Sequence, residues 1–244
     1  MNIRSAIVLF AAAVSFSAAS NATPGKIVKC PATITVSGAY ELTDNLDAIG
    51  TCITVMADFV TIDLAGWRIR GDGTGAAVTS LTLPTPIPVR ATTVRNGSVT
   101  RFSNAIELQD GNVDELKSFD NTNVGILVVQ GSVRNSLASG NSSNHGISVG
   151  PGSVVSGNVS TNNRTGISAG GFSVVIGNTV HGNTNGGIST LNSMNIVNNN
   201  ASANGSFGIA VECPSLVLGN TAVGNAQNLL LIFAGCKDEH NVAP

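Results

Sequence analysis

The chain has 244 residues, of which only 11% are charged and 4% are aromatic. Soluble domains average about 25% charged residues, so this chain is poor in charge. With 42% hydrophobic residues and a formal net charge of −2, it is neither a disordered polyelectrolyte nor a basic nucleic-acid-binding protein. The plentiful Asn, Ser, Thr, Val and Gly favour short strands joined by tight turns.

The N-terminus has the pattern of a secretory signal peptide. Arg4 supplies a positive charge, residues 6–16 form a short apolar run, and Ser20-Asn21-Ala22 is a typical cleavage site. The run is too short to span a bilayer comfortably, although an uncleaved anchor is the alternative. We therefore expect residues 1–22 to be removed and residues 23–244 to form a single domain. The mature protein is expected to be secreted or periplasmic, without a membrane span.

A regular repeat occupies the chain beyond residue 100, where a Gly-Ile pair recurs at nearly constant spacing. Within each repeat the apolar residues alternate with polar ones, which is the period of a β-strand. Short strands stacked from repeat to repeat at about 4.8 Å make a parallel β-solenoid. A leucine-rich repeat and a calcium-binding nonapeptide repeat do not fit, because their motifs are absent. The apolar position after the recurring Gly predicts one interior row: Ile106, Ile126, Ile147, Ile167, Ile188, Ile209 and Leu229.

Two columns of asparagine accompany the repeat. Asn tolerates the left-handed backbone of a sharp turn, and stacked amides can hydrogen-bond from coil to coil. We therefore predict a structural role for them rather than a ligand-binding one. The first column holds Asn158, Asn178, Asn198 and Asn220, and the second holds Asn121, Asn141, Asn162, Asn183, Asn204 and Asn225.

The coils before residue 100 are less regular but follow the same plan. Residues 34–36 and 53–55 look like equivalent strands of successive coils, and residues 40–42 and 60–62 follow in register. All-β architecture with about nine or ten coils of about 20–22 residues is therefore expected for the whole domain.

Four cysteines allow three disulfide pairings. One coil length and a small loop separate Cys30 from Cys52, and the same interval separates Cys213 from Cys236. Residues one coil apart lie about 4.8 Å from each other, within the Cα separation of a disulfide. We predict the bonds Cys30–Cys52 and Cys213–Cys236, which would join the first two and the last two coils.

The residues of the early coils carry a family likeness. Residues 57–66 followed by Ile69-Arg70-Gly71, and residues 94–99 followed by Ala105-Ile106, resemble bacterial right-handed parallel β-helix repeat proteins. The resemblance implies the pectate-lyase-like superfold, which hosts pectate lyases, polygalacturonases, alginate epimerases and members without known activity. The fold therefore does not by itself imply a function.

The enzymes of this superfold have recognisable requirements. The resemblance implies an Arg or Lys base beside Ca²⁺ for a lyase, and two or three close Asp residues for a hydrolase. It implies an Asp-Pro-His-Glu run for an epimerase. The chain has no such run and no Asp-Asp pair, and His145 lies within the repeat frame, where we expect an exposed turn residue.

Charges gather between residues 57 and 120 in neighbouring coils. The simplest expectation is mutual pairing and solvation of an outer surface. The alternative is a polar site with acids for Ca²⁺ and an arginine for an anionic sugar. A longer coil at residues 77–104, with Pro84, Pro86 and Pro88, predicts a loop nearby. The candidate residues are Arg95, Arg101, Glu107, Asp110 and Asp114.

The later coils predict a bare outer wall. The outward column after Glu107 reads Leu127, Ser148, Ser168, Ser189, Ala210 and Leu230, which suits a scaffold or contact surface better than a cleft. We therefore expect a non-catalytic binding or structural envelope protein without a cofactor, whose partner is a polysaccharide or a cell-surface component. The alternative is a polysaccharide lyase or related carbohydrate-active enzyme that acts on an acidic polysaccharide with Ca²⁺.

Overall fold

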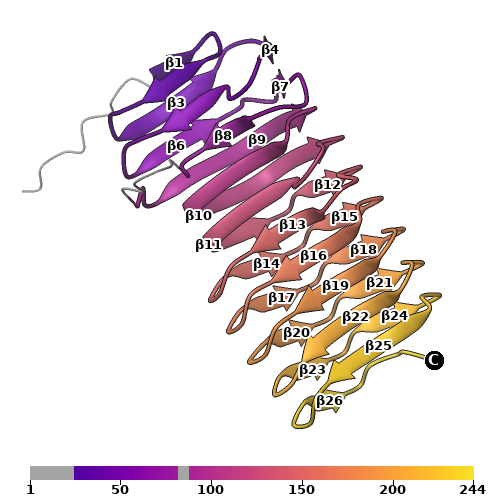
Figure 1. Cartoon of the computed structure of the whole chain (residues 1–244). Coiled ribbons are helices and arrows are strands. Elements are labelled where there is room, and N and C mark those ends of the chain that lie inside the picture. Colours follow the sequence, from indigo (N-terminus) through magenta and orange to yellow (C-terminus); the bar gives the residue numbers. More distant parts are fainter. Residues whose placement is uncertain (1–24, 82–87) are drawn as a thin grey trace, which may run out of the picture.

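The computed structural model describes residues 25–81 and 88–244. Within them every regular element is a β-strand, and parallel strands stack into the predicted right-handed β-helix of about ten turns (Figure 1). The expected signal peptide, residues 1–22, lies outside the described residues, as do Pro84 and Pro86 of the expected loop.

Each coil contributes one short strand to each of three faces. The first face contains β2 (Ala32–Ile34), β5 (Ile53–Val55), β8 (Ala76–Thr79), β13 (His145–Val149), β16 (Thr165–Ala169), β19 (Gly186–Thr190), β22 (Phe207–Glu212) and β25 (Gln227–Ile232). The long strands β10 (Asn104–Phe119) and β11 (Ile126–Arg134) begin on this face and bend onto the second.

The second face is built in the same way. It contains β1 (Gly25–Ile27), β3 (Gly38–Leu42), β6 (Val60–Asp63), β14 (Val154–Ser156), β17 (Val174–Ile176), β20 (Asn195–Val197), β23 (Leu216–Leu218) and β26 (Lys237–Glu239). The start of β9 (Thr92–Thr100) also belongs to it.

The third face completes each coil. It contains β4 (Leu46–Asp47), β7 (Arg68–Arg70), β12 (Leu137–Ser139), β15 (Val159–Thr161), β18 (Thr179–His181), β21 (Asn200–Ser202) and β24 (Thr221–Val223). The ends of β9 and β10 pair with this face.

The predicted interior row of the first face is confirmed. The residues from Ile106 to Ile209 pair in register from coil to coil and are fully buried, and Leu229 continues the row half-buried in the last coil. Each fully buried Ile stabilises the fold by about 1.5–3 kcal/mol relative to an exposed one. Valines from the second face meet this row across the core.

The register predicted for the first coils is wrong by two residues. Ile34 pairs with Val55 rather than with Ile53, and Tyr40 pairs with Ile62 rather than with Val60. A shift of two residues leaves every side chain on the same side of its strand, so alternation alone cannot distinguish the two registers.

The asparagine columns are real, but two members were misassigned. Asn199 and Asn163 stand in the hydrogen-bonded columns, in place of the predicted Asn198 and Asn162. Asn198 and Asn162 precede them with left-handed φ values of 53° and 56° and are exposed. Turn and column therefore use successive residues, and an Asn-Asn run in the sequence does not show which is which.

The recurring glycine is required by the column of asparagine amides that packs beside it. A Cβ added at Gly146 would lie 2.5 Å from Asn163 Nδ2, and one at Gly187 would lie 2.8 Å from Asn204 Nδ2. The buried amides fill the space that any larger residue would need. The repeat thus couples a glycine on one strand to an asparagine in a neighbouring turn.

Both predicted disulfides are present. The Cα atoms of Cys30 and Cys52 are 4.6 Å apart, and those of Cys213 and Cys236 are 4.9 Å apart. The first bond joins the coils of β2 and β5, and the second joins the last two coils. Within the described residues no helix is long and apolar enough to cross a membrane.

Candidate functional site

The structure brings two of the five candidate residues together. Arg95 and Asp114 are paired neighbours on the outer side of the second face. Glu107 lies on the first face, and Asp110 pairs with Gln130 where β10 bends from the first face to the second. Arg101 occupies the turn after β9 on the third face, with a left-handed φ of 62°. The five side chains are therefore distributed around the coil.

Glu107 is held by its own neighbours. Thr79 donates a hydrogen bond from Oγ1 to Glu107 Oε2 at 3.1 Å, and the Asn104 amide donates to Oε1. The carboxylate is half-buried. These bonds tie three strand positions of adjacent coils and use both carboxylate oxygens.

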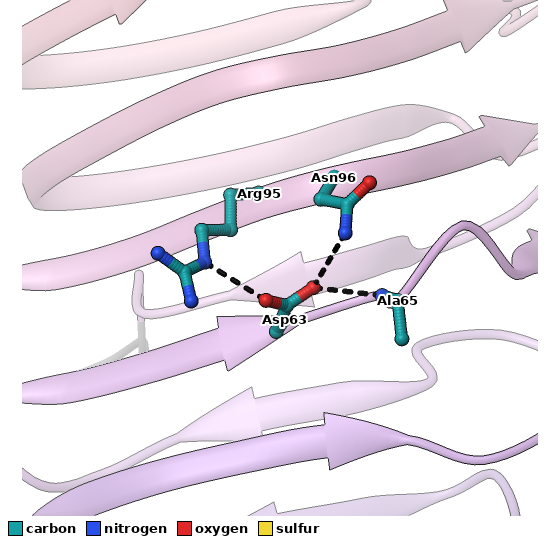
Figure 2. A network of polar contacts seen from close by, with 4 residues as sticks. All are labelled: Asp63, Ala65, Arg95 and Asn96. Carbon is teal, nitrogen blue, oxygen red and sulfur yellow. Dashed lines mark hydrogen bonds and ion pairs between the residues drawn. The ribbon is translucent and has the colours of Figure 1, made fainter.

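Arg95 belongs to a polar network between coils. Its Nε donates to Asp63 Oδ2 at 2.9 Å, while the Asn96 amide and the Ala65 backbone N–H donate to Asp63 Oδ1 at 3.1 and 2.8 Å. Figure 2 shows Arg95 and Asn96 of β9 reaching Asp63 at the end of β6. Asp63 thus fixes the turn after β6 and orients the guanidinium along the surface.

These residues belong to a charged row along the outer side of the second face. Successive coils place six charged residues in register, with both signs present. Adjacent members lie about 4.8 Å apart along the solenoid. The row is Lys26, Glu41, Asp63, Arg95, Asp114 and Arg134.

A shallow depression lies beside this row, at the corner between the second and third faces. Its volume is about 140 Å³, and it is lined by Gly66, Asn96, Gly97, Ser98, Glu115 and Lys117. A Cβ on Gly97 would collide with Leu64 and the Trp67 carbonyl, so this position needs glycine for the close approach of the two coils. We call this feature the corner depression.

Trp67 directly follows Gly66, one of the residues that line the corner depression. Its carbonyl accepts a hydrogen bond from the Ser98 backbone N–H at 3.1 Å, and its side chain is 38% exposed. The lining supplies hydrogen-bond donors from Asn96 and Lys117 and acceptors from Glu115 and Ser98. An aromatic surface therefore adjoins polar groups of both kinds.

Sequence reasoning missed most of this arrangement. Trp67, Asn96, Ser98 and Lys117 are not among the residues that the sequence indicated as candidates. The one available signal was that Trp67 is the only tryptophan of the chain. The turn between the two faces, which the sequence did not place, brings these residues together.

His145 lies on the first face, away from the corner depression, and is half-buried rather than exposed in a turn as predicted. Among the described residues its Nδ1 has no hydrogen-bond partner. Burial of the ring, and secondarily the Arg164 cation, lowers the pKa of His145 below its ordinary value. In the part of the chain that the structure describes, no three His, Cys, Asp or Glu side chains gather as a metal site.

Comparison with known proteins extends the description of the fold. No protein-family model and no curated protein sequence matches the chain. The A-module of mannuronan C-5 epimerase AlgE4 from Azotobacter vinelandii is similar at 16% identity and a TM-score of 0.57, over 80% of this chain and 72% of the module. The AlgE6 A-module is similar at 16% identity and a TM-score of 0.56, over 80% of this chain and 71% of that module. The Dettilon tailspike protein is similar at 14% identity and a TM-score of 0.51, over 87% of this chain and 53% of that protein. At these identities the likeness shows a shared fold, the parallel β-helix.

Proposed function

We propose that the protein binds a polysaccharide at the corner depression and the adjoining charged row, without cleaving it. The observation that carries this proposal is an exposed tryptophan, bonded through its carbonyl to Ser98, next to a depression lined by donors, acceptors and both signs of charge. A sugar ring offers apolar C–H surfaces to an aromatic face and hydroxyl groups that both donate and accept hydrogen bonds. Both kinds of surface meet at Trp67.

The charges favour an acidic sugar. Lys117 lines the depression, and Arg95 is held at its side by a single Nε contact to Asp63. Arginine and lysine recognise carboxylates through charge-assisted hydrogen bonds. Two of the similar structures belong, by their names, to mannuronan epimerases, which supports a polysaccharide as the ligand class.

The second candidate function is catalysis on an acidic polysaccharide. The pairing of Arg95 with Asp114 in neighbouring coils favours it, because a cation and a carboxylate then stand together beside the depression. Asp110, Asp114 and Ca²⁺ would cooperate in that case, as two acids suit a hard cation. Binding without turnover remains our first proposal because Glu107 and Arg101 lie on other sides of the coil.

The single tryptophan provides a direct test of binding. Titration with polymannuronate, polygalacturonate and a neutral glucan, with and without Ca²⁺, should change the Trp67 fluorescence for an acidic polymer. Trp67→Ala should abolish retention of the protein in an affinity gel containing that polymer. Phe233→Ala removes an exposed aromatic residue from a distant coil and should retain wild-type mobility.

The same samples separate the two functions. Unsaturated or epimerised products would show that the protein is an enzyme and overturn the non-catalytic role. If no polymer alters the fluorescence or the gel mobility, the corner depression is not a polysaccharide site. Lys117→Ala should weaken binding of an acidic polymer more than binding of a neutral one, since only the acidic polymer loses a charge-assisted contact.

We further propose that the protein is exported, since two disulfides are typical of oxidising compartments. Cell fractionation combined with intact mass measurement tests this. The expected result is a secreted or periplasmic chain that begins near Thr23.

A further inference from the structure

The outer side of the second face changes character after Arg134. Up to that residue it carries the charged row, and from β14 to β23 it carries mostly aliphatic side chains. No charged residue lies on this face between Arg134 in β11 and Lys237 in β26. Two paired rows form the patch, which we call the apolar face: Val154, Val174, Asn195 and Leu216 in one row, and Ser156, Ile176, Val197 and Leu218 in the other.

Phe172 extends the apolar face at its edge. It is 75% exposed, and its φ of 60° places it in the left-handed region, where the previous coil has Gly152. A bulky residue in that conformation is an outlier that persists where the surroundings or the function demand it. Ile176 is 38% exposed on the same side. Exposed apolar residues gathered on one side of a protein mark interaction sites.

The charges that border the apolar face identify its occupant. Arg134 lies two coils before Ile176, and Glu239 lies two coils after Val197, all in one outward row. A two-fold axis along the strands, midway between Ile176 and Val197, would place Ile176 of one copy opposite Val197 of the other. In the adjoining row it would place Val174 opposite Asn195. The same axis would place Arg134 of each copy opposite Glu239 of its partner.

Glu239 is available for such a contact. Its only ion pair in the described chain is with Lys237, at 3.4 Å, and the two side chains are 46% and 68% exposed. An exposed pair of this kind contributes little to stability and is readily exchanged. Arg134 is exposed as well. Figure 1 shows β14, β17, β20, β23 and β26 following one another along one side of the solenoid.

We propose that the apolar face is a homodimer interface, in which two copies pack their second faces together with antiparallel solenoid axes. The aliphatic side chains of the two copies meet at the centre around Asn195, and two Arg134–Glu239 pairs close the ends. A two-fold interface of this type uses the same patch on both subunits. From Arg134 to Glu239 the face is only about 24 Å long, at about 4.8 Å per coil, so the dimer should dissociate on dilution.

Charge exchange is the sharpest test. Sedimentation velocity over the micromolar range should show a concentration-dependent dimer. Arg134→Glu and Glu239→Arg should each reduce dimerisation at least tenfold, because each places like charges opposite one another twice. The double variant R134E/E239R restores opposite charges and should recover dimerisation. Such recovery requires the two residues to face each other, and instability of a single variant cannot produce it.

A second pair of variants tests the centre of the interface. Ile176→Asp should leave the protein monomeric at every concentration. Ser168→Asp is the matched control, because it introduces the same charge on the outer side of the first face in the same coil, and it should dimerise normally. A wild-type protein that stays monomeric would overturn the proposal. So would a dimer that tolerates Ile176→Asp, or a double exchange that recovers nothing.

Discussion

The residue type at many positions of this solenoid is determined by packing against the coil before or after it. Gly187 is the clearest example, because an added Cβ would overlap the Gly208 carbonyl and come within 2.8 Å of Asn204 Nδ2. The neighbouring backbone cannot move away without losing its own strand pairing. A glycine that looks like a simple turn signal in the sequence is in fact demanded by packing.

Gly187→Ala should therefore lower the free energy of unfolding by about 1–3 kcal/mol, the usual cost of overpacking a buried site. Chemical denaturation followed by circular dichroism measures the change. Gly177→Asn is the control, since Gly177 has a φ of 66° with open space around its Cα, and Asn198 takes the equivalent turn one coil later. A Gly187→Ala protein as stable as the control would contradict this explanation.

His145 makes the stability of the protein depend on pH. Because its pKa is lowered in the folded chain, the unfolded chain binds the proton more readily. The contribution is fully present above about pH 6.5 and is lost as the pH falls through the folded-state pKa. Thermal unfolding of the wild type and His145→Gln between about pH 5 and about pH 7.5 should show a smaller loss at low pH for the variant. Identical slopes would exclude His145 as the source.

At the scale of the element, the asparagine columns link the turns as hydrogen bonds link the strands. Asn178 donates from Nδ2 to Asn199 Oδ1 at 2.9 Å and to the Val155 carbonyl at 3.0 Å, and its Oδ1 accepts from the Asn158 backbone N–H at 2.9 Å. All of these groups are buried. Each amide therefore satisfies backbone groups that the turn would otherwise leave without partners.

Asn178→Ala should cost about 1–3 kcal/mol per buried polar group that loses its partner, and more than one such group is affected. Hydrogen exchange should reveal faster exchange at Asn158 and in the coils on either side. Asn200→Ala, which removes an exposed amide from the third face in the next coil, should leave both stability and exchange unchanged. Loss of protection throughout the solenoid would show that the effect is not local.

The whole molecule is held at its ends by covalent bonds, where a solenoid has only one neighbouring coil. In repeat architectures stability is a sum of coils and their interfaces, so the terminal coils open first. Cys213–Cys236 joins the last two coils, and Cys30–Cys52 performs the same task at the other end.

Replacing Cys213 and Cys236 together by Ala should cost about 3 kcal/mol, the value expected for a loop of this order. The loss should appear as increased hydrogen exchange in β25 and β26, with the central coils unaffected. The variant lacking Cys30 and Cys52 should show the mirror-image pattern at β2 and β5. Uniform destabilisation in both variants would contradict the view that each bond protects its own end.

Properties that depend on a short stretch of the chain could be predicted from the sequence. Properties that depend on how separate coils are aligned could not. Alternation within a strand and the length of a coil are local, so the interior row from Ile106 to Ile209 was readable. The predicted register of the first coils was wrong by two residues, because Ile34 keeps its side of the strand in either register. The sequence could not show whether Asn162 or Asn163 joins the hydrogen-bonded column, because neighbouring residues within a turn do not alternate in a regular pattern.

The candidate site was harder to predict from the sequence, because it depends on where residues lie around the coil. The chain order indicated that Arg95 and Asp114 lie in neighbouring coils, but not that they share a face while Glu107 and Arg101 do not. Position around the coil depends on where each turn falls, and turn geometry is weakly encoded. The place of Trp67 next to the residues of the corner depression was therefore not predicted.

The sequence by itself determined the solenoid, its coil length, its interior row and the pairing of its cysteines, because each follows from spacing along the chain. Only the tertiary structure decided which polar residues converge beside Trp67 and that the second face is charged before Arg134 and apolar after it. Those properties arise from stacking successive coils at about 4.8 Å, so they exist only once the coils are in register.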